Sequence, residues 1–209
     1  KDWIASPAQE KEVWRTSAII EAVFLLGNRL SGTWRYETKG KNINFNFGWF
    51  MKEILNGGLT EDKRKKVAIG LIKLLANNYV LYLKTHNFHW NVVGPMFQPL
   101  HSVFEGQYID LWNAGDTIAE RVRALGFPVP ASYADFAKLS KIKEAVGTRT
   151  IKAKDMISQL VHDQEVMVRL ARELLPETEE ADDQVSVDLL SERMEVHEKN
   201  AWMLRSFLE

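Results

Sequence analysis

The stretch KTHNFHWNVVGPMFQPLHSVFE, residues 84–105, contains three of the chain's five histidines around a Gly-Pro break. Gly94 and Pro95 end one helical pattern, and a second helical pattern begins shortly after them. The break allows the chain to fold His89, at the end of the first helix, back toward His101 in the second. Two interpretations are open at this point: polar residues at a helix end, or ligands for a metal ion.

Helical periodicity continues on both sides of this stretch. The apolar spacing predicts helices over residues 60–90, 99–125, 133–139, 151–175 and 185–208. We expect the fourth of these to end at Pro176 and an acidic loop to follow over residues 177–183. Four long amphipathic helices, with one short helix in the long second connection, predict an all-α fold of the ferritin-like four-helix bundle type.

Residues 1–50 differ from the rest of the chain because they are dense in aromatic residues. The pattern predicts a helix over residues 7–29 and a loop or weak strand over residues 42–48. The chain begins with Lys, whereas Met51 opens a stretch with the character of a natural start. We therefore expect a bundle domain over residues 51–209 and an N-terminal extension of unknown role over residues 1–50. The extension is either translated upstream sequence or an accessory segment that packs through its aromatic side chains.

The composition excludes several classes of protein. The chain has no cysteine, so disulfides, thiolate zinc sites and cysteine nucleophiles are absent. This composition fits a reducing compartment, and we expect a cytoplasmic protein. The apolar run over residues 18–27 is short and carries Glu21, so we expect no membrane span. The net charge of −1 gives no electrostatic argument for nucleic acid.

Two pairs of side chains on the second helix strengthen the metal interpretation. His101 and Glu105, and likewise Asp116 and Glu120, are four residues apart and share a helix face. Imidazole with several carboxylates suits Fe(II), Mn(II) or Zn(II). However, His101 and Asp116 are separated by roughly 22 Å of helix, which is too far for one ion. Either the two pairs are unrelated patches, or two copies of this helix lie antiparallel across a two-fold axis.

The antiparallel arrangement predicts a dimer whose metal sites are shared between chains. One copy supplies three ligands and the other supplies two: His89, His101 and Glu105, and Asp116 and Glu120. The axis crosses near residues 110–111, where Leu111 and Trp112 are expected to supply apolar contact. The chain lacks the pair of Glu-x-x-His motifs that a di-iron site inside one bundle requires. The alternative is a solvated acidic helix face and capping histidines.

Four segments closely resemble the Dps family, the ferritin-like mini-cages known as DNA-binding proteins from starved cells. They are HNFHWNVVG (86–94), FQPLH (97–101), DTIAERVRALG (116–126) and VHEKNAWMLR (196–205). The resemblance covers about residues 59–209. It implies a spherical dodecamer built from two-fold dimers, with a hollow interior and iron-oxidising sites at the two-fold interface.

The resemblance also implies a chemistry. By position it assigns His89, His101 and Glu105 of one subunit, and Asp116 and Glu120 of its partner, as ferroxidase ligands. Family members oxidise Fe(II), preferably with hydrogen peroxide, and store the Fe(III) mineral, which protects against oxidative stress. Zinc or manganese is expected as a substitute metal. Many relatives have Asp where Glu105 stands, so the iron position is expected to shift slightly.

Three carboxylates correspond by position to the family's cation pores at three-fold axes: Glu179, Asp183 and Asp188. The alternative is an ordinary solvated loop. The family's DNA binding often depends on a basic tail, whereas the basic run here, residues 63–66, favours a solvated helix face. A DNA-binding protein with little ferroxidase activity is the alternative function, and a structural zinc protein is a third.

The remaining residues of interest have two interpretations each. Trp90, next to His89, either packs against its neighbours or donates electrons. We expect His86 either to support the metal ligands from behind or to be structural. We expect His162 and His197 to be structural, since neither has matching ligand partners.

Overall fold

The computed structural model describes residues 33–38, 41–46, 55, 57–145 and 151–209. The chain divides into two compact units, Lys1–Asn56 and Gly57–Glu209. In the first unit, β1 (Thr33–Thr38) and β2 (Lys41–Asn46) form an antiparallel hairpin. The expected weak strand is therefore present as β2, whereas β1 was not expected. The helix predicted over residues 7–29 lies outside the described residues, and the role of residues 1–50 stays a prediction.

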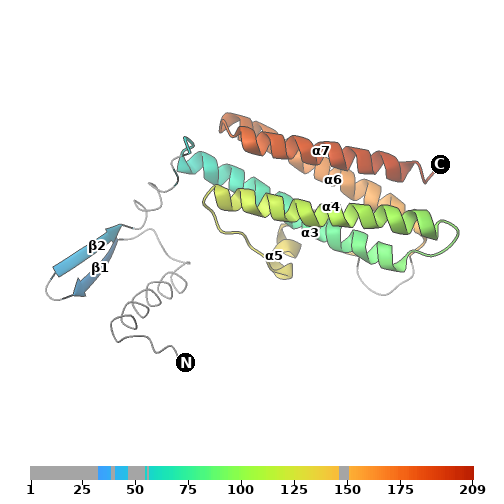
Figure 1. The fold of residues 1–209 in the computed structure, drawn as a ribbon, viewed down its shortest axis with the longest axis horizontal. Coiled ribbons are helices and arrows are strands. Elements are labelled where there is room, and N and C mark those ends of the chain that lie inside the picture. Colours follow the sequence, from blue (N-terminus) through green and yellow to red (C-terminus); the bar gives the residue numbers. More distant parts are fainter. Residues whose placement is uncertain (1–32, 39–40, 47–54, 56, 146–150) are drawn as a thin grey trace, which may run out of the picture. The chain divides into compact units, whose positions relative to one another are not determined.

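The second unit is a bundle of four long helices with one short helix beside it (Figure 1). Its elements are α3 (Glu61–Asn91), α4 (Phe97–Ala124), α5 (Tyr133–Leu139), α6 (Ala153–Glu180) and α7 (Gln184–Arg205). The helix α3 packs along α4, α6 packs along α7, and α3 also contacts α5 and α6. The all-α, ferritin-like four-helix bundle with an extra helix in the second connection is confirmed.

Local sequence signals explain where these helices begin and end. The Thr60 side chain accepts a hydrogen bond from the Lys63 backbone N–H and caps α3. Gly94 and Gly126 have φ values of 103° and 93°, the left-handed region that suits glycine, just beyond α3 and α4. After α4 the Phe127 N–H also bonds to the Val122 carbonyl, which completes a Schellman-type end.

The predicted end of the fourth helix at Pro176 is wrong, because α6 continues through Pro176 to Glu180. Residues 177–180 of the expected acidic loop are therefore helical. Pro176 itself is exposed, while Leu174, Thr178 and Ala181 continue the buried face of the helix past it. A proline inside a helix costs about 3 kcal/mol. Burial of this face against the rest of the bundle offsets that local cost.

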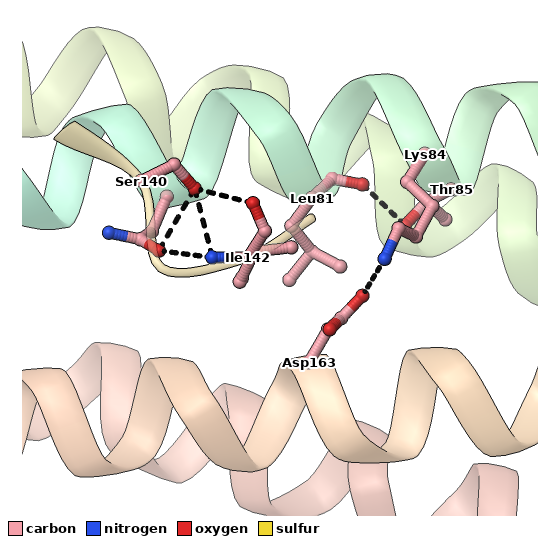
Figure 2. A network of polar contacts seen from close by, with 7 residues as sticks. Leu81, Lys84, Thr85, Ser140, Ile142 and Asp163 are labelled. Atoms are coloured by element: carbon pink, nitrogen blue, oxygen red, sulfur yellow. Dashed lines mark hydrogen bonds and ion pairs between the residues drawn. The ribbon is translucent and has the colours of Figure 1, made fainter. Parts of the chain in front are cut away.

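A band of hydrogen-bonded polar side chains crosses the bundle, and we call it the polar belt. It consists of Lys84, Gln107, Asp110, Asp163, Gln164, Arg193 and His197. Lys84 Nζ donates to Asp163 Oδ2 over 2.5 Å, which joins α3 to α6 (Figure 2). The other bonds join α4 to α6, α6 to α7, and α7 to α4. The belt therefore links all four long helices.

The connection between α5 and α6 docks onto α3 through one buried amide. The side-chain oxygen of Asn77 accepts hydrogen bonds from Ser140 Oγ and from the backbone N–H groups of Lys141 and Ile142. Figure 2 shows Ser140 and Ile142 of this connection beside α3. Asn77 is fully buried, so the bonds satisfy a polar group that would otherwise be costly.

The helix α3 is long and apolar enough to cross a membrane, by length and composition alone. In the structure, 56% of the relevant window is buried inside the protein. The same apolar residues include Leu71, Leu74 and Leu75, which form part of the bundle core. Packing within the bundle therefore explains the apolar character of α3.

Candidate metal centre

His89 at the end of α3 and His101 near the start of α4 lie against each other, as predicted. Their ring centroids are 3.8 Å apart and the rings are stacked at 21°. Each Nδ1 lies 2.9 Å from the backbone carbonyl oxygen of the other histidine. The turn at Gly94, with its positive φ, brings the two helix ends together.

This reciprocal bonding fixes the tautomer of both histidines. A carbonyl oxygen only accepts, so each Nδ1 must carry a proton and donate it. In the neutral ring, each Nε2 then keeps a lone pair that a metal ion can bind. A histidine whose other ring nitrogen donates to a backbone carbonyl is the usual arrangement around protein-bound metals. His89 and His101 therefore have the hydrogen bonding that ligands need.

The other three predicted ligands lie on one exposed face of α4. We call this face the outer stripe; it consists of Glu105, Ile109, Trp112, Asp116 and Glu120, at helical spacing. Ile109 and Trp112 are 47% and 57% exposed and lie between the two groups of carboxylates. An exposed apolar centre flanked by carboxylates has the composition of a contact surface with metal ligands at its edges.

The structure corrects one residue of the expected contact. Leu111 is fully buried in the core, so it is unavailable to a second copy of the chain. Trp112 is on the exposed face as expected, and Ile109 takes the place assigned to Leu111. The spacing of four, three, four and four residues along the outer stripe is a sequence signal that identifies Ile109.

One chain alone does not complete a metal site in the part that the structure describes. Among residues 33–38, 41–46, 55, 57–145 and 151–209, no three acidic or histidine side chains converge to hold a metal ion. His101 and Asp116 lie on the single continuous helix α4, so the helix separates them as the spacing predicted. The predicted ligands on one chain therefore form two separated groups.

Aromatic residues surround the two histidines. The His86 ring stacks on Tyr108 with the ring centroids 4.0 Å apart, and its centroid is also 4.0 Å from that of the tilted Trp90 ring. Tyr108 also meets His89 edge-on at 5.1 Å. Burial, with a smaller contribution from His89, lowers the pKa of His86. His86 therefore packs against two aromatic rings, as a structural residue does.

The three predicted pore residues have different environments. Glu179, in the last turn of α6, and Asp188, in the first turns of α7, are exposed. Asp183 is buried, caps α7, and accepts hydrogen bonds from Arg121 and Ser186. Burial disfavours its charged form, but the bonds from Arg121 and Ser186 outweigh burial and lower the pKa of Asp183.

The basic run at residues 63–66 is partly engaged inside the protein. Arg64 donates to the Leu125 and Leu59 carbonyl oxygens and lies over the Phe127 ring. Lys63 forms an ion pair with Asp182 at 3.2 Å. These contacts leave Lys65 and Lys66 as the exposed cations of the run, which is a small basic surface.

His197 belongs to the polar belt and is fully buried. Its Nδ1 bonds to Gln164 Oε1 at 2.5 Å. Burial, with a smaller effect of the nearby Arg193 charge, lowers the pKa of His197 to about 3. His197 therefore stays neutral and acts as a hydrogen-bonding core residue.

Comparison with known proteins gives a consistent family. The model of the ferritin-like domain matches residues 70–209. A low temperature-induced protein from Nostoc sp. is 42% identical, with 74% of this chain and 87% of the relative covered. A DNA protection during starvation protein from Brevibacillus brevis is 41% identical, with 68% of this chain and 95% of the relative covered.

Solved structures agree with this result. The crystal structure of a Dps protein from Bacillus brevis has a TM-score of 0.67 and 39% identity, covering 71% of this chain and 98% of that chain. A Dps protein from Vibrio cholerae O1, described as one of the ferritin-like diiron-carboxylate proteins, has a TM-score of 0.69 and 32% identity. It covers 72% of this chain and 94% of its own. The chain therefore belongs to the Dps family of ferritin-like proteins.

Proposed function

We propose that this protein oxidises Fe(II), preferably with hydrogen peroxide, at sites shared between two copies of the chain. The Fe(III) product is stored inside a dodecameric cage, which protects the cell against oxidative stress. The single observation that carries the proposal is the reciprocal bonding of His89 and His101, which leaves both Nε2 lone pairs free for metal. The relatives are bacterial, and we assign the activity to the bacterial cytoplasm.

The outer stripe supports the sharing of sites between copies. Glu105 is four residues from His101 on α4, whereas Asp116 and Glu120 lie farther along the same helix. If two α4 helices pack antiparallel through Ile109 and Trp112, each histidine pair meets the distant carboxylates of the other copy. Such an isologous contact creates two equivalent sites per dimer.

The ligand types suit iron oxidation. Carboxylates are hard oxygen ligands that stabilise Fe(III), and neutral imidazoles bind Fe(II) well. Zn(II) or Mn(II) has similar ligand preferences and would compete for the same groups. In the reaction, two Fe(II) ions each give one electron to peroxide, the O–O bond breaks, and two solvent protons complete two water molecules. Both reactants of hydroxyl-radical chemistry are thereby removed.

A mixing experiment tests both the activity and the shared site. His101→Ala and Asp116→Ala chains are each purified, and both are also coexpressed. Each variant alone lacks every complete site, so neither oxidises Fe(II) rapidly after a peroxide pulse. In a mixed dimer one site carries both lesions and the other is intact, so random pairing restores about a quarter of the wild-type sites. The rise of Fe(III) absorbance measures the recovery.

Thr117→Ala is a matched control, because Thr117 is exposed beside Asp116 and is not a proposed ligand. It is expected to keep the wild-type rate. Mixed assemblies that contain both variants yet remain as inactive as each variant alone would exclude shared sites. Equally slow Fe(II) oxidation in wild type and all variants would mean that the proposed ligands do not promote the reaction.

DNA protection is a second candidate, which the names of the Brevibacillus brevis and Bacillus anthracis relatives favour. A gel-shift titration at increasing salt tests it. Binding to DNA through phosphate contacts would weaken steeply with salt. Because Arg64 is buried and Lys63 is paired, we expect weak binding at physiological ionic strength.

A further inference from the structure

Three residues from two helices form a closed ring of hydrogen bonds, which we call the clamp. Arg121 Nη2 bonds to Asp183 Oδ1 at 2.5 Å, and Arg121 Nε bonds to Ser186 Oγ at 2.9 Å. Ser186 Oγ in turn donates to Asp183 Oδ2 at 2.6 Å. The side chains of Arg121 and Asp183 are 16% and 2% exposed. The clamp is therefore a shielded ion pair with defined geometry, unlike a surface salt bridge.

The position of the clamp connects two regions of interest. Arg121 directly follows Glu120 and is just over one turn beyond Asp116 on α4. Asp183 is the N-cap residue of α7. In the sequence it falls between the two exposed pore candidates, Glu179 on α6 and Asp188 on α7. The clamp thus joins the turn of α4 that carries two proposed iron ligands to the α6–α7 turn.

The bonding leaves Asp183 little capacity for a cation. Its Oδ1 accepts from Arg121 and from the Ser186 backbone N–H, and its Oδ2 accepts from the Ser186 hydroxyl. Meanwhile α4 packs mainly along α3. In the part of the chain that the structure describes, the polar side-chain bonds from α4 to α7 and its cap are the clamp and the Arg193–Asp110 pair. The clamp is therefore the polar link between the end of α4 and the start of α7.

We propose that Asp183 is a positioning residue, which holds Arg121 and thereby fixes the Asp116 and Glu120 half of the iron site, and that it is not a pore ligand. The effect on iron binding rests on the proposed function. The effect on the position of the α4 end does not depend on iron. The two effects therefore need separate measurements.

Asp183→Asn is the informative variant, because Asn caps helices as well as Asp does but has no charge for Arg121. Hydrogen exchange is measured without iron, and we expect faster exchange at residues 116–124 in this variant. Anaerobic Fe(II) titration measures the site itself. We expect about tenfold weaker Fe(II) affinity, as for other residues that orient metal ligands. Arg121→Lys keeps the charge but loses the two-nitrogen contact. We expect its Fe(II) affinity and its exchange rate at residues 116–124 to lie between those of Asp183→Asn and wild type.

Two controls separate positioning from other roles. Thr60→Ala removes the cap of α3 and is expected to lower stability without changing Fe(II) affinity. Asp188→Asn removes an exposed pore candidate and is expected to slow iron uptake without changing exchange at residues 116–124. Wild-type exchange and affinity in Asp183→Asn, with uptake slowed as in Asp188→Asn, would overturn the proposal and make Asp183 a pore ligand. If the wild-type protein binds no Fe(II), the proposed function is wrong. The hydrogen-exchange result would still show whether the clamp holds the end of α4.

Discussion

The polar belt and the outer stripe contain similar side chains, yet the structure uses them in opposite ways. In the belt, Asp163 bonds to Lys84, and His197 bonds to Gln164, deep inside the bundle. On the outer stripe, Asp116 and Glu120 are exposed, and no ion pair engages them in the described part of the chain. The difference teaches that burial commits a polar group to its neighbours, whereas exposure leaves it free for a ligand.

The energetic reason for this difference is desolvation. A charge removed from water is tolerated only with a partner in good geometry. Burial raises the pKa of Asp163 above its usual value, although the bond from Lys84 acts in the opposite direction. A carboxylate on the outer stripe is exposed and keeps its hydration. Substitutions in the two regions should therefore have contrasting effects.

The largest expected effect is in the belt. Asp163→Ala leaves the Lys84 ammonium buried without its partner, so we expect the free energy of unfolding to fall by about 3–5 kcal/mol. Urea unfolding followed by circular dichroism measures this change. Glu198→Ala breaks the exposed Arg172–Glu198 pair and is the control, with an expected loss of about 1 kcal/mol or less. Equal losses for both variants would contradict the contrast between buried and exposed pairs.

Trp112→Glu tests the apolar centre of the outer stripe. If two copies pack through this face, a charge there should weaken association by at least about 2 kcal/mol, as at other buried interface tryptophans. Sedimentation velocity measures the assembly state, and helix content by circular dichroism checks the fold. Leu139→Glu, at another exposed apolar position outside the outer stripe, is the comparison. If Trp112→Glu still forms intact assemblies, this face is not the contact between two copies.

His197→Phe tests the belt through the pH dependence of stability. The native pKa of His197 is about 3, against 6.5 for an unperturbed histidine, so below pH 6.5 the unfolded chain takes up a proton that the native chain refuses. Stability should therefore fall with decreasing pH, by about 1.4 kcal/mol per pH unit for this group. The variant should lose that part of the slope between pH 6.5 and 5 in urea unfolding. A slope identical to wild type would disprove the buried neutral histidine.

The smallest stability change is expected on the outer stripe. Asp116 is exposed, so we expect Asp116→Asn to change the free energy of unfolding by only about 0.5 kcal/mol or less. The same variant should lose fast Fe(II) oxidation under the proposed function. Both quantities should be measured on one preparation of each variant. Asp163→Ala should change mainly the free energy of unfolding, and Asp116→Asn mainly the rate of Fe(II) oxidation. A large loss of stability in Asp116→Asn would mean that this carboxylate is structural.

The sequence was most informative where local rules suffice. The Gly94-Pro95 break and helix spacing were enough to predict that His89 and His101 meet, and the structure confirms that they do. Pro176 misled the prediction of α6, because a buried face extending through Ala181 outweighs the local preference of proline. Propensity describes one segment at a time, and packing against other helices is outside its scope.

The environment of individual side chains was harder to predict. Leu111 and Trp112 are neighbours in sequence, yet one is fully buried and the other is 57% exposed, because one residue turns a helix by about 100°. Asp183 belongs to an acidic sequence, but its bonds to Arg121 come from a helix 62 positions away. Periodicity identifies the first kind of difference, whereas the second depends on tertiary contacts that spacing does not encode.

Under the proposed function, the turn at Gly94 has a consequence for when iron oxidation begins. His89 and His101 are only 12 residues apart, so their mutual bonds close a short loop and form as soon as the two helices fold. A newly made single copy then has its imidazoles in place but lacks the carboxylates of another copy. Under the proposed function, oxidation would begin only at protein concentrations that allow pairing. Solitary chains would then not bring iron and peroxide together outside a cage.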